Sequence, residues 1–165
     1  MTRTVQLVLL LALGSCADEP RSFGDITTDP ELPPRGEGDI DGWIDEGHYL
    51  AWRCEPQPVD VRLGSPHRPQ TRTCNNAAIV SSGPTGELPV GAGSVKEMYD
   101  DAGQIKGFGV SRKLATGGAD GWYWYEKISG DVKADGMGAP AGSCSGCHMD
   151  AARDFTYVYV PTTAQ

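Results

Sequence analysis

The most constraining feature of this 165-residue sequence is a Cys-x-x-Cys-His run formed by Cys144, Cys147 and His148. Two thiols three positions apart on one helical turn can each add across a vinyl group of haem, and the adjacent histidine then reaches the iron as an axial ligand. In an exported protein this run is the attachment motif of c-type haem. The sequence therefore predicts one covalent haem c, with Cys144 and Cys147 as thioether anchors and His148 as the iron ligand.

Two other interpretations of the same run are half of a zinc site and a redox-active dithiol. A zinc ribbon needs a second closely spaced cysteine pair. Cys54 and Cys74 lie 20 positions apart and do not supply one. Haem attachment is therefore the leading hypothesis, with the other two kept as alternatives.

The N-terminus has the pattern of a secretory signal. Residues 1–15 contain one cation, Arg3, and an apolar stretch that is too short to span a bilayer. The next residues resemble a bacterial lipobox, Leu-Gly-Ser-Cys, in which the cysteine (here Cys16) is acylated and becomes the first residue of the mature chain. A chance cysteine near an ordinary cleavage site is the alternative. Because Ala17 rather than an aspartate follows, known sorting rules imply an outer-membrane anchor, on the periplasmic side or at the cell surface.

The cysteine count predicts a disulfide. Of the five cysteines, one is assigned to lipid and two to haem, which leaves Cys54 and Cys74 to pair with each other in an oxidising compartment. Closing a loop of about twenty residues contributes about 3 kcal/mol by the chain-entropy estimate.

The charge of the chain excludes one class of partner. The formal net charge is −8, and removal of Arg3 with the signal leaves −9 on the mature chain. We expect no nucleic-acid partner for a chain this acidic.

The remaining sequence divides into a tether and one domain. Residues 16–40 begin at the acylated cysteine and are rich in proline and acidic residues without apolar periodicity, which predicts a disordered, solvated tether. Residues 41–165 are long enough for one haem-binding domain. A helix is expected from Asp41, an N-cap residue, because apolar residues recur at helical spacing from there as far as Cys54.

Most of the domain shows the period-two pattern of β-strands. Strands are predicted at residues 59–63, 94–99, 104–114, 122–128 and 155–160, with a turn at residues 100–103 and one turn of helix at residues 149–153. The predicted fold class is α+β and β-rich: an antiparallel meander sheet with a few packed helices and a C-terminal haem motif.

This pattern excludes two helical kinds of cytochrome. The small electron-transfer cytochromes carry the haem motif near the N-terminus and a methionine ligand well downstream. Here Met149 is the only methionine after His148, and it is adjacent to that ligand. The four-helix cytochromes c-prime need long amphipathic helices, which the alternation of residues 93–160 contradicts.

The sequence resembles the cytochrome P four-sixty family and the related cytochromes c-prime-beta. The resemblance rests on Gly-Ser-Val-Lys-Glu at residues 93–97, Gly-Trp-Tyr-Trp-Tyr at residues 121–125, the haem motif, and the Asp-Phe pair at residues 154–155. It implies an antiparallel sheet with packed helices, a frequent homodimer, and a five-coordinate iron with an open distal face. It also places Lys96 on the lysine that some members cross-link to the porphyrin; the alternative is a solvated strand lysine.

The resemblance does not identify the residue that faces the iron on its distal side. Catalytic members use a distal carboxylate on the next strand when they oxidise hydroxylamine, but no Asp or Glu occurs between residues 104 and 118, and Gly109 falls near the expected place. We therefore expect Phe108 to cap the iron and to admit neutral gases while disfavouring anions. The alternative is that Phe108 points into the core, because one residue of register decides its face.

Four other side chains are weaker candidates. His67 could be a sixth iron ligand, although a surface position is the default for a lone loop histidine. His48 is expected at an exposed helix position. Arg62 and Arg72 could pair with haem propionates, with solvated surface positions as the default.

The sequence thus predicts an exported, lipid-anchored, mono-haem c-type cytochrome. Its open site would bind a small gaseous or nitrogen-oxide ligand such as nitric oxide, or pass electrons to a redox partner protein that the sequence does not identify. One alternative is an oxidoreductase that oxidises hydroxylamine and carries the Lys96 cross-link. Another is a haem-free binding lipoprotein stapled by its disulfide, with Cys144 and Cys147 paired or metal-bound.

Overall fold

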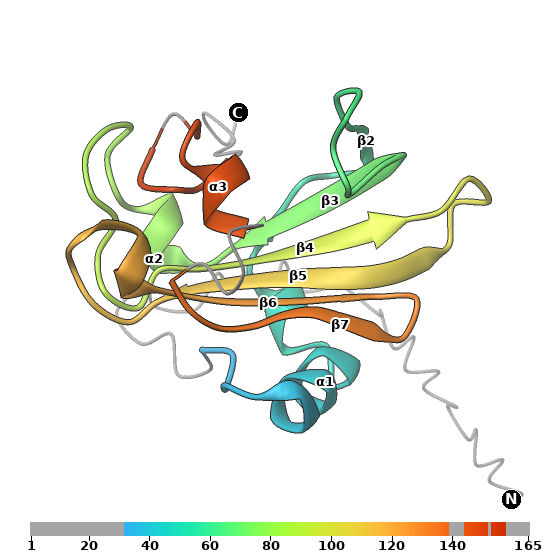
Figure 1. The fold of residues 1–165 in the computed structure, drawn as a ribbon, viewed down its shortest axis with the longest axis horizontal. Coiled ribbons are helices and arrows are strands. Elements are labelled where there is room, and N and C mark those ends of the chain that lie inside the picture. The colour runs from blue at the N-terminus through green and yellow to red at the C-terminus, as the bar shows by residue number, and fades with distance from the viewer. Residues whose placement is uncertain (1–31, 139–143, 152, 158–165) are drawn as a thin grey trace, which may run out of the picture.

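A computed structural model describes residues 32–138, 144–151 and 153–157, and its main element is a seven-stranded antiparallel sheet (Figure 1). Six strands follow the order β1-β3-β4-β5-β6-β7, and β2 pairs with β3. The strands are β1 (Arg53–Cys54), β2 (Val59–Asp60), β3 (Gln70–Asn75), β4 (Gly93–Tyr99), β5 (Ile105–Lys113), β6 (Trp122–Ile128) and β7 (Asp131–Met137). The predicted β-rich α+β class with an antiparallel sheet is confirmed.

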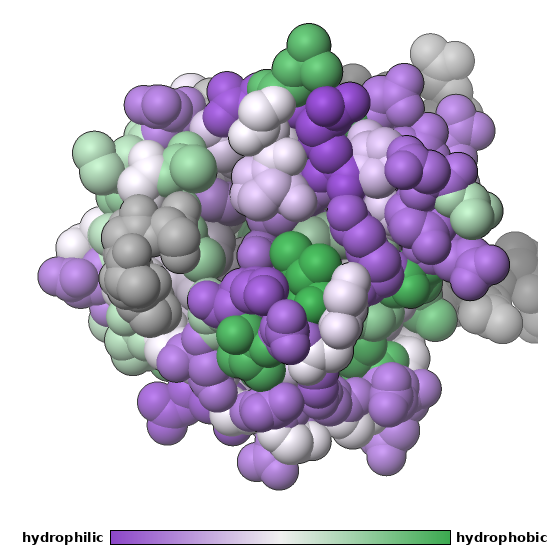
Figure 2. Space-filling model, turned by 45° about the vertical axis from the view of Figure 1, so that its right-hand side comes forward, coloured by the Kyte–Doolittle hydropathy of each residue, from purple (hydrophilic) through white to green (hydrophobic). Residues whose placement is uncertain are grey.

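Short helices cover both faces of this sheet. They are α1 (Glu37–Asp45), the 3-10 helices η1 (His48–Ala51) and η2 (Gly118–Gly121), α2 (Ala77–Val80) and α3 (Cys144–His148). Figure 1 shows α1 on one side of the sheet and α2 and α3 on the other. None of the helices in the described ranges is long and apolar enough to cross a membrane. The surface in Figure 2 is mainly hydrophilic, with only small groups of hydrophobic side chains.

The first helix differs from the prediction at both ends. It begins at Glu37 and ends at Asp45. Gly47 then adopts a left-handed conformation with φ of 74°, which interrupts the helix, and Cys54 lies on strand β1. Glycine adopts this conformation at no steric cost, so the helix ends there. The helical spacing of apolar residues continues beyond Gly47 in the sequence, which is why the predicted helix was too long.

Part of the predicted tether packs against the domain. Ile40 is completely buried. Arg112 donates a hydrogen bond to the Pro33 carbonyl at 2.7 Å, and the Gly36 amide donates to the Tyr123 hydroxyl at 2.9 Å. The expectation of a solvated tether is therefore wrong for residues 33–40. Cys16 and the proposed signal lie outside the described residues.

Four of the predicted strands coincide with strands of the structure, and three strands, β1, β3 and β7, were not predicted as strands. Strands β4, β5 and β6 match the predicted segments to within one residue at each end. Only two residues of the predicted strand 59–63 are paired. Of the missed strands, β1 lies in the segment predicted as helix, and β3 and β7 have few apolar side chains: β3 reads Gln-Thr-Arg-Thr-Cys-Asn, with its threonines buried.

The predicted disulfide joins Cys54 to Cys74, and the prediction is confirmed. These residues are register partners on β1 and β3. Cys74 is fully buried in the core cluster on the α1 side, which also contains Ile40, Val95 and Tyr125. The bridge therefore closes the sheet edge next to that core.

The segment after the haem motif differs from the prediction. The helix comprises Cys144–His148 itself, and residues 149–151 form a turn and bend rather than a helix. Asp154 and Phe155 have positive φ angles of 41° and 61°, which do not fit a strand. Arg153 and Thr156 make one isolated bridge. The rest of the predicted strand, residues 158–160, lies outside the described residues.

Candidate functional site

One row of residues across the sheet forms the floor of the candidate site. Thr73 on β3 is paired with Lys96 on β4, Lys96 with Gly109 on β5, and Gly109 with Glu126 on β6. Paired residues in an antiparallel sheet point to the same face. An added Cβ at Gly109 would lie 4.0 Å from both Glu126 Oε2 and Lys96 Cβ. The glycine thus leaves space between a lysine and a carboxylate.

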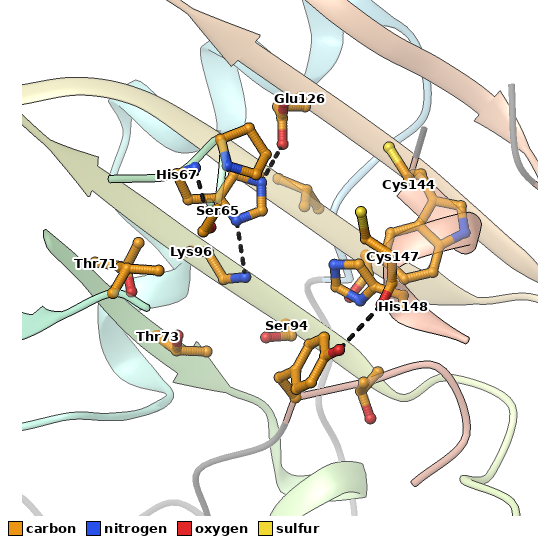
Figure 3. Close-up of a pocket in the computed structure, with 18 of the residues that line it drawn as sticks. Ser65, His67, Thr71, Thr73, Ser94, Lys96, Glu126, Cys144, Cys147 and His148 are labelled. Atoms are coloured by element: carbon orange, nitrogen blue, oxygen red, sulfur yellow. Dashed lines mark hydrogen bonds and ion pairs between the residues drawn. The ribbon is translucent and has the colours of Figure 1, made fainter. Parts of the chain in front are cut away.

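A cavity of about 660 Å³ lies above this row. Its other walls are the loop of residues 61–67 and helix α3 with the following segment. Figure 3 shows His67, Lys96 and Glu126 on one side, and Cys144, Cys147 and His148 on the other. A volume of this size is typical of a cofactor or small-molecule site.

The sequence context of His67 suggested a surface position, but the structure places this residue in the cavity wall. Its side chain is only 15% exposed. His67 Nε2 lies 2.7 Å from Glu126 Oε2, and His67 Nδ1 lies 3.4 Å from Lys96 Nζ. The loop that carries it is held by the His67 amide, which donates to the Ser65 hydroxyl. His67 therefore belongs to the site.

Burial and charge alter the pKa values of three other polar groups that line the cavity. Burial lowers the pKa of Lys96, and the carboxylates of Glu126 and Glu55 oppose this effect only in part. Burial acts to raise the pKa of Glu126, but the hydrogen bond and charge of His67, with the charge of Lys96, hold it below its ordinary value. Burial raises the pKa of Glu55, which accepts a hydrogen bond from the Thr73 amide at 2.7 Å.

His148 is oriented by the segment that follows it. Its Nδ1 lies 2.7 Å from the Phe155 carbonyl oxygen, so this nitrogen carries the proton and donates. Trp124 and Tyr157 pack edge-on against the ring, with centroids 4.7 and 5.3 Å away. Burial and the charge of Lys96 lower the pKa of His148 to about 4. A neutral imidazole with its lone pair on Nε2 is the form that binds a metal.

The residues present fit a covalently attached haem. Neither Cys144 nor Cys147 is in a disulfide, and both line the cavity beside His148. Trp124, another lining residue, has a buried indole N–H with no hydrogen-bond partner within the described residues, as expected where a further acceptor belongs. In the part of the chain that the structure describes, no cluster of three His, Cys, Asp or Glu side chains could hold a bare metal ion.

The structure places Phe108 on the wrong face for a distal cap. Phe108 packs against the core cluster on the α1 side and contacts Tyr49 edge-on, with centroids 6.1 Å apart. Its neighbour Gly109, not Phe108, lines the cavity. The predicted cap is therefore wrong, because successive side chains of a strand point to opposite faces and the register selects the other alternative.

Of the three remaining weaker candidates, one lines the cavity and two do not. Arg62 lines the cavity, with its guanidinium carbon 5.7 Å from the centre of the Tyr157 ring, so its pairing with a propionate stays a prediction. Arg72 instead bonds Glu97, which is 2% exposed and also accepts from Tyr49. It does not line the cavity, and its predicted role is wrong. His48 is 27% exposed, stacks on Trp43 and pairs with Glu46.

Sequence reasoning missed Glu126. The sequence offers no carboxylate on the strand after Lys96, whereas the structure places the carboxylate of Glu126 on β6, the strand beyond it, at the cavity. Alternation within β6 carried the signal: Trp122, Trp124 and Glu126 share a face, and both tryptophans pack in the cluster that contacts Cys144. Assigning Trp124 to the cavity side would have placed Glu126 there too.

Comparison with known proteins adds no assignment. No protein-family model and no curated protein matches this chain. The interpretation of the site therefore depends on the residues and geometry described above.

Proposed function

We propose that this chain is a mono-haem c-type cytochrome. The observation that carries the proposal is the side-by-side placement of Cys144, Cys147 and a neutral His148 on the wall of one large cavity, with His148 Nδ1 bonded to the Phe155 carbonyl. The two thiols would hold the haem and His148 Nε2 would bind its iron. When bound, the haem supplies a redox-active iron. The opposite wall leaves space for a small nitrogen-oxide ligand, and a haem in this cavity could also transfer electrons.

The sheet, the helices and the order of the motifs support the resemblance to the cytochrome P four-sixty family and the cytochromes c-prime-beta as a proposal for this chain. We also propose export, acylation of Cys16 and attachment to the outer membrane, on the strength of the N-terminal pattern. A homodimer is part of what the resemblance implies.

Expression with a haem-maturation system tests the central proposal. We expect the mass of one haem to remain on the chain after denaturation, and Cys144→Ala to lose one of the two thioether links and alter the reduced spectrum. Ser145→Ala within the same motif is the matched control and should keep both links. A chain without added haem mass would contradict the proposal and favour the haem-free binding lipoprotein.

A Lys96–haem cross-link is a separate proposal. The Lys96 side chain enters the cavity, and burial lowers its pKa, which favours the neutral amine that can form a new bond. If the bond forms, haem should stay attached after both thioethers are cleaved, and Lys96→Ala should remove a red shift of the reduced Soret band. Identical spectra for Lys96→Ala and the unaltered protein would rule out the cross-link.

Hydroxylamine oxidation is a second candidate function, favoured by one observation. That chemistry needs a group that accepts protons within the cavity, and the hydrogen-bonded pair of His67 and Glu126 lines it. The absence of Asp and Glu from residues 104–118 is therefore no argument against this activity. Hydroxylamine turnover by the haem-loaded protein, and its loss in Glu126→Gln, would distinguish an enzyme from a ligand-binding or electron-transfer protein.

A further inference from the structure

The cavity wall opposite the haem motif joins a base, a carboxylate and a cation. His67 contacts Glu126 through one ring nitrogen, at 2.7 Å, and Lys96 through the other, at 3.4 Å. The three residues come from the loop before β3, from β6 and from β4, so only the fold brings them together. Haem attachment by Cys144, Cys147 and His148 does not use His67 at all.

These contacts fix the position of the proton on His67. The depressed pKa of Glu126 keeps its carboxylate ionised, and an ionised carboxylate can only accept hydrogen bonds. His67 Nε2 is therefore the N–H donor. The other ring nitrogen, Nδ1, is then the acceptor of the ring, and it faces Lys96 Nζ at 3.4 Å on the cavity wall.

On the proposed haem function, on which this inference rests, we propose that His67 is the proton acceptor for small weak acids that enter the cavity and bind there as anions. For an acid HX, the H–X bond breaks heterolytically, the electron pair stays on X, and the proton moves to His67 Nδ1. Glu126 is a positioning residue: its carboxylate holds the ring and stabilises the imidazolium that forms. Where Lys96 is not cross-linked and keeps its proton, its charge favours the anion that remains.

The other charged groups around the cavity do not replace this set. Glu55, Asp60, Arg62, Lys133 and His148 also line it. Glu55 already accepts from the Thr73 amide, and Arg62 lies over the Tyr157 ring. Within the described residues, Glu126 is the only carboxylate in hydrogen-bond contact with His67.

Two probe ligands distinguish proton acceptance from simple access. Hydrogen cyanide must lose a proton to bind as cyanide, whereas carbon monoxide binds unchanged. With the haem-loaded full chain, His67→Gln should lower the second-order rate constant for hydrogen cyanide about a hundredfold or more, within the range that a positioned base contributes. The rate constant for carbon monoxide with the reduced protein should stay the same. Glu126→Gln should slow cyanide binding by a smaller factor.

His48→Gln is the matched control, because His48 forms the same kind of pair with Glu46, at 2.6 Å, but neither residue lines the cavity. It should change neither rate constant. Covalent haem with equal cyanide rates in His67→Gln and His48→Gln would overturn this inference alone. Equal losses for cyanide and carbon monoxide would give His67 a steric role and also overturn it. A chain that takes up no haem would instead overturn the proposed function, and this inference with it.

Discussion

Asp154→Asn is expected to lower the free energy of unfolding by about 3 kcal/mol, because it removes a negative charge from a buried ion pair. Asp154 Oδ2 lies 2.5 Å from Lys113 Nζ, and the two side chains are 6% and 0% exposed. Asparagine keeps the shape of the side chain and tolerates the positive φ of this position. Lys113 would then retain only Glu87, at 2.8 Å, as a charged partner among the described residues. Denaturant unfolding measures the loss.

Controls separate the buried charge from the general loss of a carboxylate. Glu87 is 45% exposed, so Glu87→Gln should cost much less than Asp154→Asn. Lys113→Met in the Asp154→Asn background should recover part of the loss, since it removes the uncompensated cation. A cost for Asp154→Asn no larger than that for Glu87→Gln would show that the buried pair does not stabilise the domain.

The Asp154 pair also bears on the site. The same carboxylate oxygen accepts from the Leu88 amide at 2.8 Å, and Arg153 donates to the Gly86 carbonyl. These bonds hold the segment whose next residue, Phe155, supplies the carbonyl bonded to His148 Nδ1. The ion pair between Lys113 and Asp154 thus helps to position the carbonyl that sets the tautomer of His148, the proposed iron ligand.

The strands that could be predicted are those in which local pattern and tertiary environment agree. In β6, aromatic side chains fill both faces of the sheet, so the sequence alone indicates a strand. In β3, Thr71 and Thr73 are buried and line the cavity, and a polar strand of this kind gives no period-two signal of apolar residues. The polar side chains that face the cavity are therefore one reason why this strand was missed.

The site was predictable only where it depends on neighbours in sequence. The haem motif is local, and the cysteines and histidine do lie on one wall of the cavity. The opposite wall depends on register and on a contact between residues 59 positions apart, His67 and Glu126. A shift of one residue exchanges Phe108 and Gly109 between the two faces of β5, and nothing in the sequence of that strand alone selects between them.

Gly107→Ala is expected to destabilise the domain by about 3 kcal/mol, because strand β6 approaches the backbone there too closely for a side chain. An added Cβ would lie 2.9 Å from Ile128 Cα and closer still to the Lys127 carbonyl oxygen. Both neighbours are backbone atoms of a paired strand, so only a shift of the sheet can relieve the clash. Chemical or thermal unfolding would measure the loss.

Gly109→Ala, two positions along the same strand, is the matched control with the opposite expected sign. Its Cβ would meet only side-chain atoms, at 4.0 Å, which is ordinary van der Waals contact. Replacing a strand glycine by alanine without a clash stabilises by roughly 0.5 kcal/mol, because the unfolded chain loses freedom. Equal losses for the two variants would contradict the register that places Gly109 between Lys96 and Glu126. A stable Gly109→Ala protein would instead support the open space that this glycine leaves on the cavity floor.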